Sequence, residues 1–97
     1  MATVQLNGTL RGAAGIKVVE VNVAPDATVA DIIARLVADL PVLVPQMLNK
    51  DGSLRNNIAV FRNGRNIRLL DGFATPVSPD QTLDFFPKMG VYRVFGG

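Results

Sequence analysis

The residues that offer the clearest chemistry are the last two of the sequence, Gly96 and Gly97. Glycine has no side chain, so a Gly-Gly segment can enter a narrow channel in extended form. The carboxylate of Gly97 would be unhindered there, and an enzyme could activate it by adenylation. The activated carbonyl carbon would then be open to a nucleophile. The pair therefore indicates a main-chain carboxylate on which other proteins act.

The rest of the composition offers little other chemistry. The 97 residues include no cysteine and no histidine. The absence of cysteine excludes a disulfide framework, an iron–sulfur cluster, a thiolate zinc site and a cysteine nucleophile. Histidine is the commonest general base, so its absence removes most hydrolytic designs short of an unusual Ser–Lys pair. We therefore expect no catalytic residue, no metal site and no enzyme activity of the chain alone.

Positive charge is concentrated in the second half of the chain. The formal net charge is +2; residues 1–49 contribute −1 and residues 50–97 contribute +3, from seven basic and four acidic side chains. An ordinary solvated hairpin explains this excess most simply, and a docking patch for an acidic protein partner is the alternative. Its centre consists of Arg55, Arg62, Arg65 and Arg68.

Nucleic acid and membrane partners are not indicated. The basic residues are not interleaved with aromatic ones and form no recognised nucleic-acid-binding motif. Neither a secretory leader nor an apolar run of membrane-spanning length is visible. We therefore expect a single domain in the cytoplasm.

The first quarter of the sequence predicts two strands. Residues 3–10 alternate between apolar and polar up to Leu10, and residues 16–23 are rich in β-branched side chains. The segment 11–15 contains two glycines and predicts a hairpin connection, so the two strands should be antiparallel neighbours. The side chains expected to face the core from the second strand are Val19, Val21 and Val23.

A helix is predicted after Thr28, which stands in the N-cap position. Asp31 would place a negative charge beside the positive end of the helix dipole. Arg35 and Asp39 form an i,i+4 pair on the exposed side, and Pro41 should end the helix near residue 40. The apolar stripe that faces the core consists of Val29, Ile32, Ile33, Leu36, Val37 and Leu40.

The second half of the sequence predicts three more strands, over residues 57–62, 65–70 and 82–86. Asn63 and Gly64 form the preferred two-residue turn of a β-hairpin, because both residue types tolerate positive φ. In the returning strand, Ile67 and Leu69 are expected to share one side.

The order strand, strand, helix, strand, strand, strand predicts an α+β fold. One amphipathic helix would cover one face of a mixed sheet, and a crossover would carry the chain from the second strand to the third. This arrangement is the β-grasp, the fold of ubiquitin. We expect a β-grasp domain over residues 1–87 and a C-terminal tail over residues 88–97.

Several segments in the second half of the sequence together resemble the ubiquitin-like sulfur-carrier family. That family includes the small subunit of molybdopterin synthase, the thiamine sulfur carrier and the small archaeal modifier proteins. The matching pieces are Val60–Ile67 around the Asn-Gly turn, Ala74–Val77, Asp80–Leu83, the strand ending at Pro87, and the final Gly96-Gly97.

One departure from the family pattern lies before the two glycines. In the family, Gly-Gly follows the proline almost directly, whereas here eight residues, Lys88 to Phe95, intervene. Either Val91 to Phe95 extend the last strand or pack on the domain, or the insert is an apolar segment that lies in a groove of a partner.

The resemblance implies a carrier whose chemistry is supplied by other proteins. An activating enzyme of the ubiquitin-activating type would use ATP to adenylate Gly97, with Gly96 permitting access, and no cofactor would be bound by the chain itself. The adenylate would become a thiocarboxylate that donates sulfur, most directly to the molybdopterin precursor on the large subunit of molybdopterin synthase. Alternatively, Gly97 would be joined to lysine side chains as a protein modifier.

The resemblance also implies a docking surface for these partners. For the four residues Phe61, Ile67, Phe73 and Phe86, ordinary packing in the core is the alternative, because buried aromatic residues dominate cores. A third hypothesis is a non-catalytic β-grasp interaction module in which the Gly-Gly pair has no role. The candidate docking residues are Phe61, Arg62, Arg65, Ile67, Phe73, Phe86, Tyr92 and Phe95.

Overall fold

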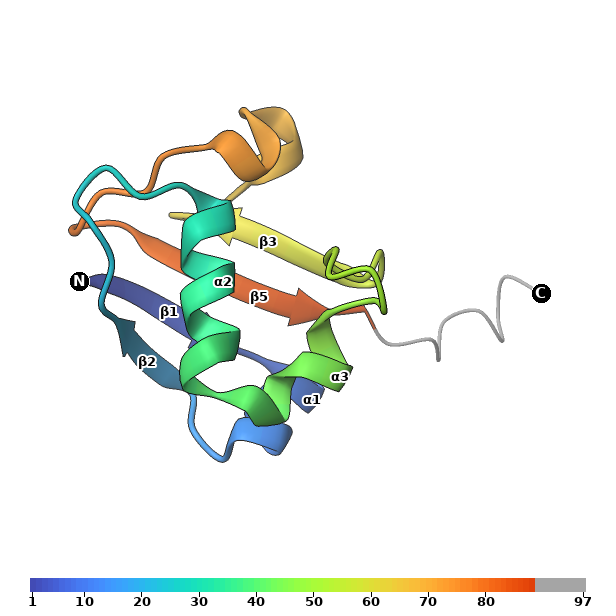
Figure 1. Ribbon diagram of the computed structural model, residues 1–97. Coiled ribbons are helices and arrows are strands. Elements are labelled where there is room, and N and C mark those ends of the chain that lie inside the picture. Colours follow the sequence, from blue (N-terminus) through green and yellow to red (C-terminus); the bar gives the residue numbers. More distant parts are fainter. Residues whose placement is uncertain (89–97) are drawn as a thin grey trace.

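The structure, a computed structural model, describes residues 1–88, and residues 89–97 lie outside the described part. Within that part, five strands form one sheet in the order β2-β1-β5-β3-β4, and the helix α2 crosses one of its faces (Figure 1). The strands are β1 (Ala2–Leu6), β2 (Val18–Val21), β3 (Ile58–Arg62), β4 (Arg65–Asn66) and β5 (Thr82–Pro87). The helices are α1 (Gly8–Ala14), α2 (Val29–Asp39) and α3 (Val44–Met47), with short 3-10 helices η1 (Pro41–Leu43), η2 (Ile67–Leu69) and η3 (Gly72–Ala74).

The strands β1 and β5 run parallel to each other in the middle of the sheet, with Val4 opposite Leu83 and Leu6 opposite Phe85. β2 pairs antiparallel with β1, while β3 pairs antiparallel with both β5 and β4. The sheet is therefore mixed, as predicted, and the antiparallel pairing of the first two strands is confirmed. The whole is a ubiquitin-like β-grasp.

The core lies between α2 and the sheet face toward it. Alternate residues of the central strands point into this core, and Leu6, Leu83 and Phe85 have no exposed surface. From the other side, α2 contributes Ile32 and Leu36, which are also fully buried. Each such side chain stabilises the fold by about 1.5–3 kcal/mol when it leaves water, so the middle strands are the most strongly held part of the sheet.

The helix α2 begins as the sequence predicted. The Thr28 Oγ1 accepts a hydrogen bond from the Asp31 N–H at 3.3 Å, and the Thr28 N–H donates to Asp31 Oδ2 at 3.0 Å. The two residues thus satisfy each other's backbone groups as a capping box. The predicted pair of Arg35 and Asp39 is present at 3.1 Å, and the helix ends at Asp39 before Pro41.

The segment between β1 and β2 differs from the prediction. The expected strand over residues 3–10 ends at Leu6, and the expected hairpin loop over residues 11–15 is largely helical, so both predictions are wrong there. The helix α1 occupies this segment, and Leu10, which was expected on a strand face, is fully buried on a helix instead. A period-two pattern misled the prediction because Leu10 fits the core-facing position of either element.

Side-chain and glycine contacts explain why a helix replaces the hairpin. Asn7 ends the strand, and its Nδ2 donates to the Phe85 carbonyl of β5 at 3.1 Å. At the other end, Gly15 adopts a φ of +74° and its N–H donates to the Arg11 carbonyl at 2.8 Å. A glycine in this left-handed conformation is a common helix terminator, so Gly15 closes α1 rather than a hairpin turn.

The predicted strand over residues 65–70 is wrong beyond Asn66. The Asn66 Oδ1 accepts a hydrogen bond from the Arg68 N–H at 2.9 Å, which turns the chain into η2. As a result Ile67 is buried while Leu69 is 77% exposed, so the two do not share one side. Side chains of asparagine compete with strand ladders in this way.

The hairpin turn at Asn63 and Gly64 is confirmed, with φ angles of +48° and +82°. Asn63 also binds the neighbouring strand, because its N–H donates to the Thr82 carbonyl at 2.8 Å and its Oδ1 accepts from the Thr82 N–H at 2.7 Å. The turn between β3 and β4 is therefore anchored to the start of β5.

Gly8 provides a test of how α1 is joined to the end of β5. Its φ is +56°, and a Cβ added there would lie 3.0 Å from the Pro87 Cγ. We expect Gly8→Ala to lower the free energy of unfolding by about 1–2 kcal/mol in urea titrations, since a left-handed conformation is costly for alanine. The matched control is Gly12→Ala, where a Cβ meets nothing within 4 Å. That variant should gain up to about 1 kcal/mol from helix propensity. Equal stability of the two variants would contradict this explanation.

Candidate functional site

The strand β5 carries the chain toward its last residues from the centre of the sheet (Figure 1). It lies between β1 and β3, and its final residue is Pro87. The next residue, Lys88, is still tied to the domain, because its N–H donates to the Asn57 carbonyl at 2.5 Å. The predicted attachment residues Gly96 and Gly97, and the docking candidates Tyr92 and Phe95, lie outside the described residues.

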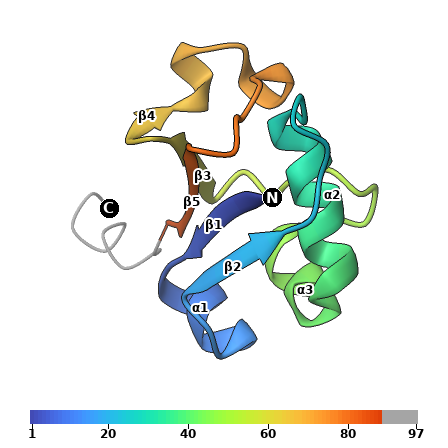
Figure 2. The ribbon, with the colours of Figure 1, turned by 90° about the vertical axis from the view of Figure 1, so that its left-hand side faces the viewer.

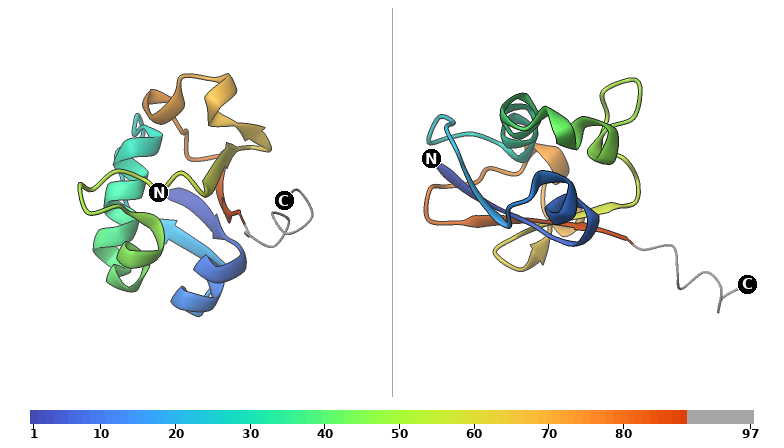
Figure 3. Two further views of the ribbon diagram at one scale, coloured as in Figure 1. Left: turned by 90° about the vertical axis from the view of Figure 1, so that its right-hand side faces the viewer. Right: turned by 90° about the horizontal axis from the view of Figure 1, so that it is seen from below.

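An aromatic pair lies on the sheet face opposite α2. Figures 2 and 3 show α2 and α3 together on one side of the sheet. On the other side, Phe61 of β3 and Phe86 of β5 meet edge to face, with ring centroids 5.5 Å apart and planes at 89°. Phe86 is 42% exposed, and both rings line a shallow hollow with Gly64 and Asp84. We call this surface, made of Phe61, Gly64, Asp84 and Phe86, the aromatic face.

The other docking candidates are placed apart from this face. Ile67 is only 4% exposed and belongs to the core. Phe73 is half exposed, but it lies on η3 beside α2, on the helix side of the sheet. The structure thus brings together only Phe61 and Phe86 of the four residues expected to form an apolar docking surface.

The two arginines of the β3–β4 hairpin have different environments. Arg62 is half-buried, and its Nη1 donates to the Pro76 carbonyl at 2.9 Å. Arg65 is exposed and stands opposite Arg62 in the ladder. Arg62 therefore holds the loop that leads into β5, whereas Arg65 is available to a partner.

Asp84 was missed as a candidate by the sequence reasoning. It points out of β5 on the aromatic face, and its Oδ1 is buried without a hydrogen-bond partner among residues 1–88. Burial raises the pKa of Asp84 above its usual value, and the positive charge of Lys17 opposes that shift. The signal that could have found it is the period-two alternation of β5, which places Asp84 on the same side as Phe86.

The described residues bring no metal-binding cluster together. No group of three acidic side chains in residues 1–88 comes close enough together to hold a metal ion. In the same part of the chain, no helix has both the length and the apolar character needed to cross a membrane. The geometry instead presents an aromatic surface beside the strand that leads to Gly97, which suits recognition by another protein.

The fold is that of ubiquitin-like proteins, and the relatives of this chain are small ubiquitin-like carriers or modifiers. Residues 4–90 match the model of the ThiS family, and the chain belongs to this family of ubiquitin-like sulfur carriers. The predicted fold and family resemblance are therefore confirmed.

Relatives and solved structures agree with that assignment. Small archaeal modifier protein 3 of Haloferax volcanii is 33% identical over 81 residues, covering 84% of this chain and 87% of the relative. The crystal structure of small archaeal modifier protein 1 from the same organism matches with a TM-score of 0.83 and 31% identity, covering 91% of this chain and 94% of that one. A chain in the crystal structure of the BexX/CysO complex of Amycolatopsis orientalis matches with a TM-score of 0.76 and 26% identity, covering 92% of this chain and 97% of that one.

The raised pKa of Asp84 predicts how stability depends on pH. The folded chain holds this proton to higher pH than the unfolded chain does, so ionisation disfavours folding. Stability should therefore fall as pH rises from the ordinary carboxyl pKa to the raised one. Asp84→Asn should remove this loss and be at least as stable as the original chain near neutral pH, as measured by urea unfolding from about pH 3 to 7.

Asp51 is a control whose pKa is shifted in the opposite direction from that of Asp84. Hydrogen bonds from the Ser53 hydroxyl and N–H, at 2.6 and 2.9 Å, lower the pKa of Asp51. Its contribution to stability is present above the unfolded pKa and is lost as pH falls. Asp51→Asn should therefore reduce the loss of stability at low pH. If Asp84→Asn follows the original chain at every pH, the unpaired oxygen has no energetic effect.

Proposed function

We propose that this chain is a sulfur carrier whose Gly97 carboxylate is adenylated by a partner enzyme and converted to a thiocarboxylate. The observation that carries the proposal is the aromatic face beside β5 in a member of the ThiS family. The face offers a docking surface, and the sequence that follows β5 ends in Gly96-Gly97. The partner supplies the ATP, so the chain needs no cofactor of its own.

The proposed chemistry takes place at the main chain. A carboxylate oxygen of Gly97 attacks the α-phosphorus of ATP, and pyrophosphate leaves. A sulfur nucleophile supplied by the partner system, such as an enzyme persulfide with a thiol reductant, then attacks the carbonyl carbon and AMP leaves. Reductive cleavage of the sulfur–sulfur bond leaves the thiocarboxylate on Gly97. Gly96 lets the active-site walls close around the backbone because it has no side chain.

The first acceptor that we propose is the molybdopterin precursor, bound to the large subunit of molybdopterin synthase. This choice rests on the resemblance of the segments around Asn63-Gly64 and Asp80–Leu83 to that family. The activating enzyme, ATP and this acceptor would meet the chain in the cytoplasm. The existence of a complex that contains CysO supports the idea that a β-grasp chain of this kind works with a bound partner.

A second function is favoured by a specific observation. Two relatives that align over most of their length, 87% and 93%, are named small archaeal modifier proteins 3 and 1. In a modifier, the amine of a lysine on a target protein would attack the activated Gly97 carbonyl, AMP or an enzyme thiol would leave, and an amide bond would form. The same adenylation step and the same docking face serve both functions.

The proposal can be tested with a purified activating enzyme by following exchange between ATP and pyrophosphate. Deletion of Gly97 should abolish exchange if this residue carries the adenylate. Phe86→Ala should lower kcat/KM for the chain by about tenfold, because a partly exposed aromatic side chain is a typical interface hot spot.

Phe73→Ala is the matched control, since Phe73 is similarly exposed but lies on the helix side. It should leave the exchange rate unchanged. Exchange that persists without Gly97 would overturn the attachment site, and equal effects of the two phenylalanine variants would overturn the docking face.

A further inference from the structure

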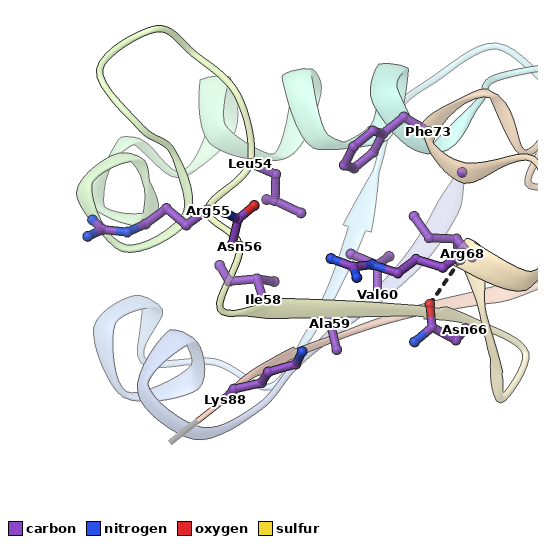
Figure 4. A pocket seen from close by; sticks show the side chains of 12 residues that line it. Leu54, Arg55, Asn56, Ile58, Ala59, Val60, Asn66, Arg68, Phe73 and Lys88 are labelled. Atoms are coloured by element: carbon purple, nitrogen blue, oxygen red, sulfur yellow. Dashed lines mark hydrogen bonds between the residues drawn. The ribbon is translucent and has the colours of Figure 1, made fainter. Parts of the chain in front are cut away.

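The outer edge of β3 borders a hollow that the proposed function does not use (Figure 4). β3 runs over five residues, but β4 is two residues long and pairs only with Phe61 and Arg62. The edge from Ile58 to Val60 therefore has no strand partner within residues 1–88. Unpaired edges of this kind accept an added strand unless something blocks them.

The backbone groups that face this edge follow from the ladder on the other side of β3. The Lys88 N–H donates to the Asn57 carbonyl, and the Asn63 N–H donates to the Thr82 carbonyl. Hydrogen-bonded residues alternate along an antiparallel pair, so Ala59 directs its backbone groups toward β5. Ile58 and Val60 consequently direct theirs toward the hollow. The Ile58 N–H is used by the Arg55 carbonyl at 3.1 Å, and the Ile58 carbonyl remains directed at the hollow.

The hollow is surrounded by positive charge. Arg55, Arg68 and Lys88 line it, and no acidic side chain of the described residues does so. The one ion pair in residues 1–88 joins Arg35 and Asp39 on α2, so these three cations are not neutralised by a salt bridge there. A ligand for this surface must therefore bring negative charge.

The positions of the cations decide what kind of ligand fits. Figure 4 shows Arg68 across the middle of the hollow, Arg55 at one end pointing away from it, and Lys88 beside Ala59 below the strand. The Arg55 Nη1 donates to the Pro45 carbonyl at 2.8 Å, which holds it at that end. The charges are spread along the strand and do not converge on one point. A single phosphate could not contact both Arg68 and Lys88, whereas a chain with several carboxylates could.

We propose that the outer edge of β3 binds an extended acidic peptide segment of a partner protein as an added strand. The peptide would bond to the outward groups of Ile58 and Val60, and its carboxylates would meet Arg68 and Lys88, with Arg55 adding positive charge at one end. Nucleic acid would satisfy the cations but could not form the backbone ladder. The edge shares no lining residue with the aromatic face, so both surfaces can be occupied.

The test is a titration with a synthetic peptide whose consecutive glutamates, flanked by valines, place carboxylates on both faces of the added strand, followed by amide chemical shifts and by fluorescence anisotropy. We expect shifts concentrated on Ile58–Val60 and Asn66–Arg68, and weaker binding as salt is raised. Arg68→Glu should weaken binding at least about tenfold. Arg11→Glu, the same change at an exposed site on α1, should have no effect.

Two further ligands distinguish binding as an added strand from binding by charge alone. The same peptide with alternate backbone amides methylated keeps its charge but cannot complete the ladder, so it should bind at least about tenfold more weakly. Equal binding of the methylated peptide would overturn the proposal. So would tighter binding of a short single-stranded RNA to the same residues, or the absence of shifts along β3.

Discussion

The parallel pairing of β1 with β5 is the constraint on which the rest of the structure depends. It places the last strand in the middle of the sheet, with β1 on one side and β3 on the other. Leu6 and Phe85 stand opposite each other in that pair and are fully buried under α2. β5 is bonded along both edges, so the described chain reaches Pro87 on the most strongly held strand of the sheet. The aromatic face depends on the same pairing, since β5 supplies Phe86.

The parts of the fold that could be predicted from the sequence are those set by residues close together in the chain. Three such elements are the capping box at Thr28, the apolar stripe of α2 and the Asn63-Gly64 turn. The helix α1 was not predicted because its position depends on a strand distant in the sequence. Asn7, just before α1, donates a hydrogen bond to the Phe85 carbonyl of β5. The early end of β4 was not predicted because the Asn66 side chain caps η2, and the strand ladder does not continue beyond this residue.

The candidate site was predictable to a similar extent and for similar reasons. Phe61 and Phe86 could be assigned to outward positions from strand alternation, but their meeting depends on the pairing of β3 with β5. Ile67 and Phe73 could not be placed, since each lies in a short 3-10 helix whose direction is set by tertiary contacts. Asp84 is identified only through strand alternation, which places this polar residue on the same face as Phe86. In the proposed function, the domain is recognised by a partner through the aromatic face, and the reactive group is the main-chain carboxylate of Gly97. This role needs no cysteine or histidine side chain, and the sequence contains neither.

The most direct measurement of the central claim is the intact mass of the protein purified from the cells that make it. The account predicts a fraction of molecules in which one oxygen is replaced by sulfur, or which are joined to another protein through an amide bond. In either form, the change should map to Gly97 after proteolysis. An unmodified carboxylate in every molecule, with the activating enzyme present and active, would contradict the account.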